Sequence, residues 1–579
     1  MSNFSLGSIS LQLTLHGLLH LLIPFQVLLV DVFLPEMPSP LALIFPCLVL
    51  AGLETFQQPL QVYENQSSSP FDAQFDQRVE WALEHFSIPG LAVAVVHGDT
   101  FVKGYGVSNT ISSQPVTEHT LFFTGSTTKA FTSAAISLLV DDNINFPAIH
   151  WDTPVHTIIP ADFVLNDTWS TSQMTIIDIL SHRSGLPRHD WVWLADVTLQ
   201  EAVRSMRHLP FTASPRTEWQ YSNLMYLVAS HLIETVTNQS LQEFFTENLW
   251  LPMNMTETYL SLSKARNAQR DIAQGYFVGL DGKIASTDQV FSDNIRGAGN
   301  ILSSVSDYAK WISTMLKRGL PFSQTGYENL FGGHSIVSPN PLEPFQTPTL
   351  YGLGWMSQAY KGEMILFHEG AQFGYGASVI LLPQRDFGLV LLGNNMDGVN
   401  AAANALAYHL IDEELEIDEE LEIPLESRFD WVARGDAIIN DGYLSENILS
   451  ELYPRIPNPP LASPVNFSAY EGSYTHPAYP ELRISSNCRS DHAYQGLNRT
   501  TPDLCASLAR YSDYSKNLEM GFFHVSGTYW LQIAVRWGHP SAVRVEFRIG
   551  PDGSASWLGI EIEPLMAERD EKIWWRHLL

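Results

Sequence analysis

Hydrophobic positions first recur with a helical period shortly after residue 70. Within residues 72–86 the apolar side chains fall on one stripe of a helix, namely Phe75, Val79, Ala82, Leu83 and Phe86. Two extended apolar runs follow at 91–96 and 101–106, and His97-Gly98-Asp99 separates them. This order predicts a helix and then a β-hairpin that turns at residues 97–99.

An extended apolar segment ends at Ser126, and a mostly helical stretch then reaches to about Leu320. The run behind Ser126 is rich in alanine and leucine and predicts a buried helix, and Ser303–Ser306 followed by Asp307 is typical of a helix start. Extended apolar segments return at 363–367, 378–382 and 388–392. We therefore expect an α+β domain over residues 71–400, in which two halves of one antiparallel sheet flank a helical lobe in the sequence.

The last part of the chain follows a different pattern. Residues 401–461 are acidic and helical, and the charged run 412–422 is expected to be a solvated connector. Val543–Ile549 alternates strictly, Pro551-Asp552-Gly553 predicts a turn, and 557–562 can return as the partner strand. This pattern predicts a separate all-β domain over residues 462–579.

The first residues are apolar and carry little charge. The first basic residue is Arg78, but Pro24, Asp31 and Pro35 interrupt the first apolar run, which argues against a membrane span of about 20 residues. A second start at Met37, followed by the apolar run 38–52, is typical of a signal peptide. We expect residues 1–56 to be a leader, with 1–36 as an upstream extension, 57–70 to be a linker and the protein to be secreted; a membrane anchor is the alternative.

Cysteines and glycosylation sequons fit the same route. Loss of the leader removes Cys47 and leaves Cys488 and Cys505, a pair that is able to form a disulfide. Sequons for N-glycosylation begin at Asn65, Asn166, Asn238, Asn254, Asn466 and Asn498. Each sequon alone is weak, but together with the cysteine pattern they favour an oxidising, secretory compartment.

Composition and charge exclude several classes of function. A content of 45% hydrophobic and 16% charged residues is typical of a folded globular protein. The 32 basic and 62 acidic residues give a net charge of −30, which repels phosphate backbones, so we expect no nucleic-acid partner. The sequence contains no HExxH motif, other metal-ligand spacing, Rossmann fingerprint or P-loop. We therefore expect no cofactor and no metal.

Candidate chemistry begins at Ser126-Thr127-Thr128-Lys129. Residues three positions apart lie on one face of a helix, so Lys129 is able to reach the Ser126 hydroxyl. A serine is a weak nucleophile until a neighbouring base accepts its proton, and the N–H groups at a helix start stabilise developing negative charge. A lone Ser-x-x-Lys is common by chance, and a solvated helix start is the alternative interpretation.

Four further segments make the pattern specific. Asp178–Pro187, Tyr221-Ser222-Asn223, Gly297–Asp307 and His368-Glu369-Gly370 follow Ser126 in this order. With it they resemble the serine β-lactamase and penicillin-binding-protein family, on the side of the class C enzymes, D-aminopeptidases and related esterases, over roughly Phe71 to Asn395. Tyr470–Tyr474 resembles the opening of the small β-barrel domains that several members carry. The resemblance implies an antiparallel sheet flanked by helices, plus a C-terminal barrel-like domain.

The resemblance also implies roles for single residues. Ser126 would be the nucleophile, Lys129 and Tyr221 would move its proton, and Asn223 would orient the lysine or the substrate. His368, Glu369 and Gly370 would lie on an edge strand that lines the cleft, and the N–H groups of Ser126 and Ala371 would form an oxyanion hole. Because lysine and tyrosine both have ordinary pKa values near 10, such a site must lower the pKa of at least one of them.

One segment departs from the β-lactamase pattern, which has Lys-Thr-Gly where this chain has His368-Glu369-Gly370. A histidine is mostly neutral near pH 7, so the fixed positive charge of that motif is absent, and Glu369 is expected to add negative charge. This favours neutral or amine-bearing substrates over β-lactams. We expect His182 and Arg183 to stabilise a loop, and Trp355 to lie in the core.

These observations favour a metal-independent serine hydrolase that cleaves an ester or amide through an acyl-Ser126 intermediate. Its partner would be a small-molecule or short-peptide acyl substrate. Two alternatives stay open: an acyltransferase in which an alcohol replaces water, and a non-catalytic ligand-binding member of the fold.

Overall fold

The computed structural model describes residues 69–578, except for 195, 280, 290–294, 342, 344–345, 416–429, 442–443, 489–500, 511–517 and 537–538. The leader 1–56, the linker up to residue 68, and the sequons at Asn65 and Asn498 lie outside the described residues. The other sequon asparagines are exposed, namely Asn166, Asn238, Asn254 and Asn466. None of the helices in this part of the chain is long and apolar enough to cross a membrane. Glycosylation and secretion stay predictions.

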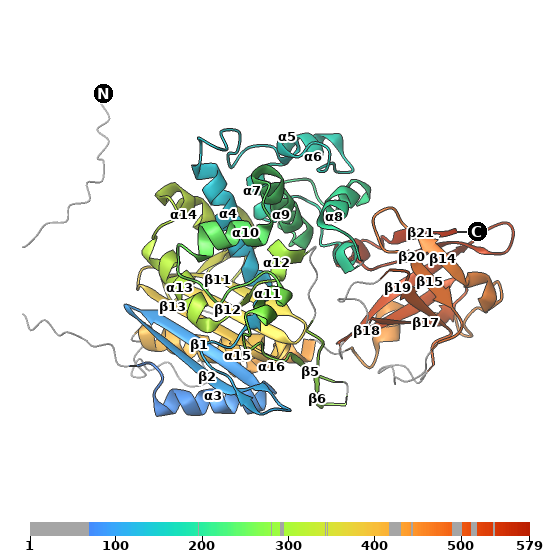
Figure 1. The fold of residues 1–579 in the computed structure, drawn as a ribbon. Helices are drawn as coiled ribbons and strands as arrows, with labels where there is room; N and C mark the ends of the chain where they lie inside the picture. Colours follow the sequence, from blue (N-terminus) through green and yellow to red (C-terminus); the bar gives the residue numbers. More distant parts are fainter. Residues whose placement is uncertain are drawn as a thin grey trace, which may run out of the picture. The chain divides into compact units, whose positions relative to one another are not determined.

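One antiparallel sheet organises the larger domain (Figure 1). Among the described residues it has nine strands in the order β3-β2-β1-β13-β12-β11-β10-β9-β8. Their bounds are β1 Gly90–His97, β2 Asp99–Asn109, β3 Gln114–Pro115, β8 Ser335–Ser338, β9 Thr349–Tyr351, β10 Met356–Tyr360, β11 Glu363–Gln372, β12 Tyr375–Leu382 and β13 Phe387–Gly393. β1 pairs with its hairpin partner β2 on one side and with β13 on the other, so the early and late strands form one sheet, as predicted.

Helices bury both faces of this sheet. Along β1, Ala92, Ala94 and Val96 belong to the core of the helical lobe. The alternate residues belong to a second core, formed with α3 (Ala73–His85), α15 (Met396–Glu414) and α16 (Trp431–Asp441). Side chains alternate between the faces of a strand, so a continuous apolar run such as β1 requires cover on both sides. The predicted amphipathic helix at 72–86 is therefore one of the covers, and α15 packs beside it.

The helical lobe connects the two halves of the sheet, as predicted. Its helices are α4 Thr128–Asp141, α5 Val155–Ile158, α6 Thr168–Gln173, α7 Ile176–Leu180, α8 Leu199–Ser205, α9 Asn223–Thr237, α10 Leu241–Phe245, α11 Leu262–Asn267, α12 Arg296–Gly299, α13 Val305–Lys317 and α14 Gln324–Phe331. Ser304 caps α13 by accepting a hydrogen bond from the Asp307 N–H, which explains the serine-rich start. Trp355 is fully buried, as expected.

The predicted C-terminal β domain is a closed barrel. Within residues 472–578, apart from the gaps given above, eight strands close in sequence order. They are β14 Gly472–Thr475, β15 Leu482–Ser485, β16 Leu504–Leu508, β17 Glu519–Ser526, β18 Tyr529–Arg536, β19 His539–Ile549, β20 Ala555–Ile560 and β21 Ile573–Leu578. β19 and β20 form the predicted hairpin. The barrel closes because its first strand, β14, pairs with its last, β21, and the predicted disulfide joins Cys488 to Cys505.

The acidic segment that precedes the barrel is described only in part. It contains α16 and α17 (Ile448–Leu452). Most of the charged run 412–422 lies outside the described residues, so its solvated state stays a prediction. The domain boundaries that we drew at 400 and 462 stay predictions as well.

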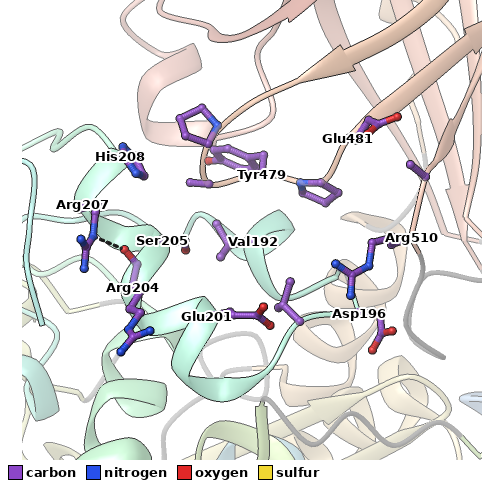
Figure 2. A pocket seen from close by; sticks show the side chains of 15 residues that line it. Val192, Asp196, Glu201, Arg204, Ser205, Arg207, His208, Tyr479, Glu481 and Arg510 are labelled. Atoms are coloured by element: carbon purple, nitrogen blue, oxygen red, sulfur yellow. Dashed lines mark hydrogen bonds between the residues drawn. The ribbon is translucent and has the colours of Figure 1, made fainter. Parts of the chain in front are cut away.

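A cavity of about 490 Å³ lies between α8 and the barrel (Figure 2). Val192 and Arg204 line it from the helical lobe, and Tyr479, Glu481 and Arg510 line it from the barrel. Neither Ser126 nor Lys129 lines this cavity.

Candidate active site

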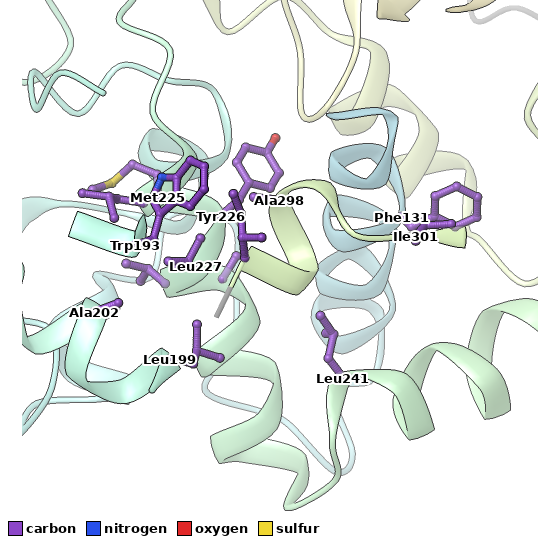
Figure 3. Packing of buried hydrophobic residues seen from close by; sticks show 14 of the residues in the cluster. Phe131, Trp193, Leu199, Ala202, Met225, Tyr226, Leu227, Leu241, Ala298 and Ile301 are labelled. Atoms are coloured by element: carbon purple, nitrogen blue, oxygen red, sulfur yellow. The ribbon is translucent and has the colours of Figure 1, made fainter. Parts of the chain in front are cut away.

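Ser126 and Lys129 meet where a short 3₁₀ turn, η1 (Gly125–Thr127), passes into α4. The Lys129 Nζ lies 3.0 Å from the Ser126 Oγ, as the three-residue spacing predicts. Ser126 is half-buried, whereas Lys129 is fully buried. α4 is held in the apolar interior of the lobe, where Phe131 of α4, Tyr226 of α9 and Ala298 of α12 belong to one core (Figure 3). The serine therefore stands at the start of a buried helix and is itself only half-buried.

Two further acceptors surround the Lys129 amine. Its Nζ lies 2.8 Å from the Asn223 Oδ1 and 2.7 Å from the Ala298 carbonyl oxygen. Burial, and then the positive charge of Arg188, hold the pKa of Lys129 well below its usual value. A neutral lysine keeps two N–H groups, which match these two acceptors, and its lone pair is left for the Ser126 hydroxyl. The geometry thus suits an amine that accepts the proton of the serine.

Tyr221 approaches Ser126 from the other side. Its hydroxyl donates a 2.7 Å hydrogen bond to the Ser126 Oγ, and its ring centroid lies 4.8 Å from the Lys129 Nζ. Burial raises the pKa of Tyr221 above its ordinary value, so the phenol keeps its proton near neutral pH. Of the two groups whose pKa values we expected a site to adjust, the lysine is therefore the one whose pKa is lowered.

A turn that precedes 3₁₀ helix η2 (Asp190–Leu194) completes this side of the site. The Asn223 Nδ2 donates to the Asp190 Oδ1 at 3.0 Å, and the Arg188 Nε donates to the Asp190 Oδ2 at 2.7 Å. The exposed Arg188 guanidinium carbon lies 5.3 Å from the Tyr221 ring centroid. Sequence reasoning missed Arg188, Asp190 and the Ala298 carbonyl. The position of 188–190 directly after the Asp178–Pro187 motif is the signal that was available for the turn.

His182 supports the loop that carries Tyr221, as expected. Its Nδ1 accepts a hydrogen bond from the Ser222 N–H, and its carbonyl oxygen accepts one from the Gln220 N–H. Its ring centroid lies 4.3 Å from that of Tyr221. Burial and the neighbouring lysine hold the pKa of His182 well below its ordinary value, so the ring is a neutral packing element. Arg183 pairs with the buried Asp178 and likewise stabilises the loop.

The strand that carries His368, Glu369 and Gly370 is not an edge strand, which corrects our expectation. β11 lies between β12 and β10. However, β10 pairs only with residues 363–367, so the half of β11 from His368 to Gln372 extends beyond it. That half lies against η1, which explains why an interior strand still lines the site.

Close backbone packing brings η1 and β11 together. Gly125 has φ +52°, and a Cβ on it would lie 2.5 Å from the Ala371 nitrogen. A Cβ on Gly370 would collide with the Thr124 carbonyl oxygen. Gln372 and Tyr375 flank a two-residue turn, and the residues that flank such a turn form a hydrogen-bonded pair. Because hydrogen-bonded and non-hydrogen-bonded pairs alternate, the next pair, Ala371 with Gly376, directs its N–H groups away from the partner strand. The Ala371 N–H therefore points toward η1, where an oxyanion hole with Ser126 requires it.

His368 and Glu369 point to opposite faces of the sheet. The His368 Nδ1 donates to the Glu369 carbonyl oxygen at 2.7 Å, so its Nε2 accepts from the Tyr351 hydroxyl at 3.1 Å. Burial, and then the charge of Lys129, lower the pKa of His368 to about 3, so the ring is neutral. Glu369 instead interacts with Arg434 of α16 and Tyr408 of α15. Its negative charge is thus on the far side of the sheet, which corrects our expectation that it adds charge to the site.

Among the described residues, no group of three or more His, Cys, Asp and Glu side chains is placed to hold a metal ion.

Comparison with known proteins identifies the family of this chain. The family model described as Beta-lactamase matches residues 71–413. The chain is 38% identical to the unguisins hydrolase ungD' of Aspergillus campestris, over 88% of this chain and 92% of that relative. It is 35% identical to the unguisins hydrolase ungD of Aspergillus violaceofuscus, over 88% of this chain and 91% of the relative. A structure of an octameric penicillin-binding protein homologue from Pyrococcus abyssi shares the fold, with a TM-score of 0.54, 19% identity, and coverage of 84% of this chain and 97% of that chain.

Proposed function

Because the chain is a hydrolase of the Beta-lactamase family, we propose that it cleaves an ester or amide bond through an acyl-Ser126 intermediate. One observation carries this proposal: a fully buried lysine with a lowered pKa lies 3.0 Å from a half-buried serine hydroxyl. A lysine that is used only for structure would be expected to keep its charge and an acidic partner. Lys129 has instead the serine, an amide oxygen and a backbone carbonyl oxygen.

Acylation follows from the positions of the three side chains. The Ser126 Oγ attacks the substrate carbonyl carbon while its proton passes to the neutral Lys129 amine. The N–H groups of Ser126 and Ala371 stabilise the negative oxygen of the tetrahedral intermediate. Tyr221, which is protonated, donates its proton to the departing amine or alcohol and recovers one from the Lys129 ammonium. The bond to the leaving group breaks, and the acyl group stays on Ser126.

Deacylation uses the same groups in reverse. A water molecule attacks the acyl carbon, and its proton passes to the neutral Lys129 amine. The Ser126 Oγ leaves as a hydroxyl with the proton of Tyr221, which recovers one from the Lys129 ammonium. The acid forms, and the free enzyme is restored with Lys129 neutral and Tyr221 protonated.

For the substrate we propose unguisins or compounds of the same chemical class. The support is the identity of 38% and 35% to two proteins named as unguisins hydrolases, across most of each chain. The neutral His368 adds a chemical argument, since it supplies no cation for a substrate carboxylate. We therefore expect weak reaction with penicillins.

Intact-mass spectrometry tests the proposed function directly. The purified protein and its Ser126→Ala variant are exposed to a fluorophosphonate, p-nitrophenyl esters, a D-amino-acid amide, an unguisin and a penicillin. We expect a covalent adduct with the fluorophosphonate and turnover of esters or of the unguisin, with turnover reduced about 10⁴-fold or more in Ser126→Ala. We expect no stable adduct with the penicillin.

The other outcomes are equally informative. No adduct and no turnover with any acyl donor would contradict the proposal and favour a ligand-binding member of the fold. An acyl-enzyme that persists in water and is released only when an alcohol or amine is added would favour an acyltransferase.

A further inference from the structure

The C-terminal barrel contacts the active-site turn through His189. The His189 N–H donates a 2.7 Å hydrogen bond to the Glu563 Oε2, although 374 residues separate the two. The His189 Nδ1 lies 2.5 Å from the Tyr479 hydroxyl oxygen. Glu563 precedes α18 (Pro564–Ala567), and Tyr479 lies between β14 and β15, so both contacts come from loops of the barrel. All three side chains are buried.

The proton positions in this cluster follow from its partners. The His189 Nε2 lies 2.9 Å from the Pro210 carbonyl oxygen, which only accepts, so Nε2 carries the proton. The Nδ1 therefore accepts from the Tyr479 hydroxyl. Burial lowers the pKa of His189 to about 4, which keeps the ring neutral. His189 is thus fixed at its backbone N–H and at both ring nitrogens, and two of these three partners belong to the barrel.

The backbone of His189 requires such support. Its φ is +45°, a left-handed conformation that is unfavourable for a residue with a side chain and persists only where surrounding contacts impose it. The residues on either side of it, Arg188 and Asp190, are those that contact Tyr221 and Asn223. Contacts therefore run without a break from Glu563 through His189 and Asp190 to Asn223, and Asn223 holds the Lys129 amine.

The barrel also contacts the opposite side of the site. The Arg536 guanidinium carbon lies 3.8 Å above the ring centroid of Phe373. Phe373 belongs to the turn between β11 and β12, two residues beyond Ala371. His539 of β19 lies 3.4 Å from Asp397 at the start of α15. The barrel thus touches both the 188–190 turn beside Asn223 and the turn that directly follows the strand of Ala371.

We propose that Glu563 and Tyr479 are positioning residues for catalysis, so that the barrel completes the active site. By fixing His189 in its left-handed conformation they hold Arg188 and Asp190, which in turn set the positions of Tyr221 and Asn223 beside Lys129. The inference rests on the proposed function, because it assigns these residues to the same serine-lysine site.

The test uses the full chain and compares two barrel carboxylates. Glu563→Ala removes the acceptor of the His189 N–H, whereas Glu563→Gln keeps an oxygen at that place. Glu561→Ala is the matched control: Glu561 is also buried, but its ion pairs are with Arg544 and Lys572 inside the barrel. Tyr479→Phe removes only the hydroxyl group that donates to the His189 Nδ1. It takes the place of Glu563→Ala in the test if that variant does not fold.

Three quantities are measured for each variant: kcat and KM with an ester, the rate of fluorophosphonate labelling, and hydrogen exchange of the peptide that contains His189. For Glu563→Ala we expect kcat and the labelling rate to fall on the order of 10- to 100-fold, because a displacement of about 1 Å has such an effect. KM should change by about twofold or less, since Glu563 is buried and acts on the site only through His189. Exchange near His189 should be faster, Glu563→Gln should recover most of kcat, and Glu561→Ala should keep the kcat and exchange of the wild type.

The two proposals fail in different ways. If the wild type is active and Glu563→Ala has the same kcat and exchange, the positioning role is wrong and the proposed function stands. An equal loss of kcat in Glu561→Ala would also overturn it, since a general effect of barrel stability would then explain both variants. If the wild type shows no Ser126-dependent reaction, the proposed function fails. The barrel contact is then judged by hydrogen exchange near His189 alone: unchanged exchange in Glu563→Ala would overturn it, and faster exchange would support it.

Discussion

Two regions contribute to the candidate site in different ways. Where η1 passes into α4, Ser126 and Lys129 reach each other because they are three positions apart along the helical chain. The 188–190 turn reaches the site only through contacts with distant parts of the chain, including a barrel residue 374 positions away. The nucleophile and its base are thus encoded locally, while the environment that adjusts them depends on the complete fold.

The two basic side chains of the site, Lys129 and Arg188, show the same contrast. Lys129 is fully buried and its pKa is held well below its usual value. Arg188 is exposed, is paired with Asp190, and keeps its charge, because a guanidinium does not lose its proton in proteins. The buried amine is suited to exchange a proton, and the exposed guanidinium is suited to act as a fixed charge. Each prediction below tests one side of this contrast.

Replacement of the buried amine should have the largest effect. Lys129→Met keeps a chain of similar length but removes the group that accepts the Ser126 proton. General-base catalysis contributes about 10²–10⁴-fold, so we expect kcat/KM for ester hydrolysis to fall by a factor in this range. The rate of fluorophosphonate labelling should fall in parallel.

Lys103→Met is the control for this change. Lys103 pairs with Asp76 on the far side of the domain core and is partly exposed. Its loss should leave kcat/KM unchanged, because an exposed ion pair contributes little. Labelling of Lys129→Met at the wild-type rate would show that Lys129 is not the base.

A smaller loss is expected from a change in the local backbone. Gly125→Ala places a methyl group 2.5 Å from the Ala371 nitrogen and at a left-handed φ of +52°. The strand or η1 must then move, and the two N–H groups of the oxyanion hole separate. Loss of one such donor costs about 10²–10³-fold in kcat, which we take as the expected range.

The Gly98→Ala variant distinguishes the effect of backbone strain from the effect of a steric collision. Gly98 also has a positive φ, +66°, but no atom lies within 4 Å of the position that its Cβ would take. We expect this variant to lose stability and to keep kcat. An equal loss of kcat in both variants would indicate that backbone strain, and not the approach of η1 to Ala371, causes the effect.

The same contrast explains what could be predicted from the sequence. The hairpin at 91–106, the strands at 363–392 and the hairpin of the barrel are patterns of a few residues, and the structure confirms them. Ser126 and Lys129 were identifiable because helical spacing fixes their distance. Tyr221, Asn223 and Ala371 required the resemblance to a family, since nothing in the local sequence shows that they meet Ser126.

Other features could not be predicted because they depend on long-range packing. The Ala298 carbonyl binds Lys129 through its backbone, so its side chain gives no signal. Asp190 contacts Asn223 because the loop from His182 onward packs against the start of α9. The motif His368-Glu369-Gly370 suggests that Glu369 shares the cleft with His368, but neighbours on a strand point to opposite faces.

The smallest expected effect is a shift in the pH dependence of kcat/KM, and it concerns the two charges of the 188–190 turn. Lys129 must be neutral to accept a proton, so kcat/KM should rise with pH through the pKa of Lys129 in the free enzyme. Burial is the largest cause of the lowered pKa of Lys129; next, Arg188 lowers it by repelling the ammonium, and Asp190 raises it by attracting the ammonium. Arg188→Gln should therefore move this rise to higher pH, and Asp190→Asn, which keeps an oxygen for Asn223, should move it to lower pH.

The double variant decides whether charge causes these shifts. Arg188→Gln combined with Asp190→Asn removes one charge of each sign, so the rise should return toward its wild-type position, and Arg188→Lys should stay close to the wild type. Shifts of both single variants in the same direction would mean that the turn acts by its shape, because altered packing would then outweigh the charges. No shift in any variant would mean that burial alone sets the pKa of Lys129, and the 188–190 turn would then have no electrostatic role.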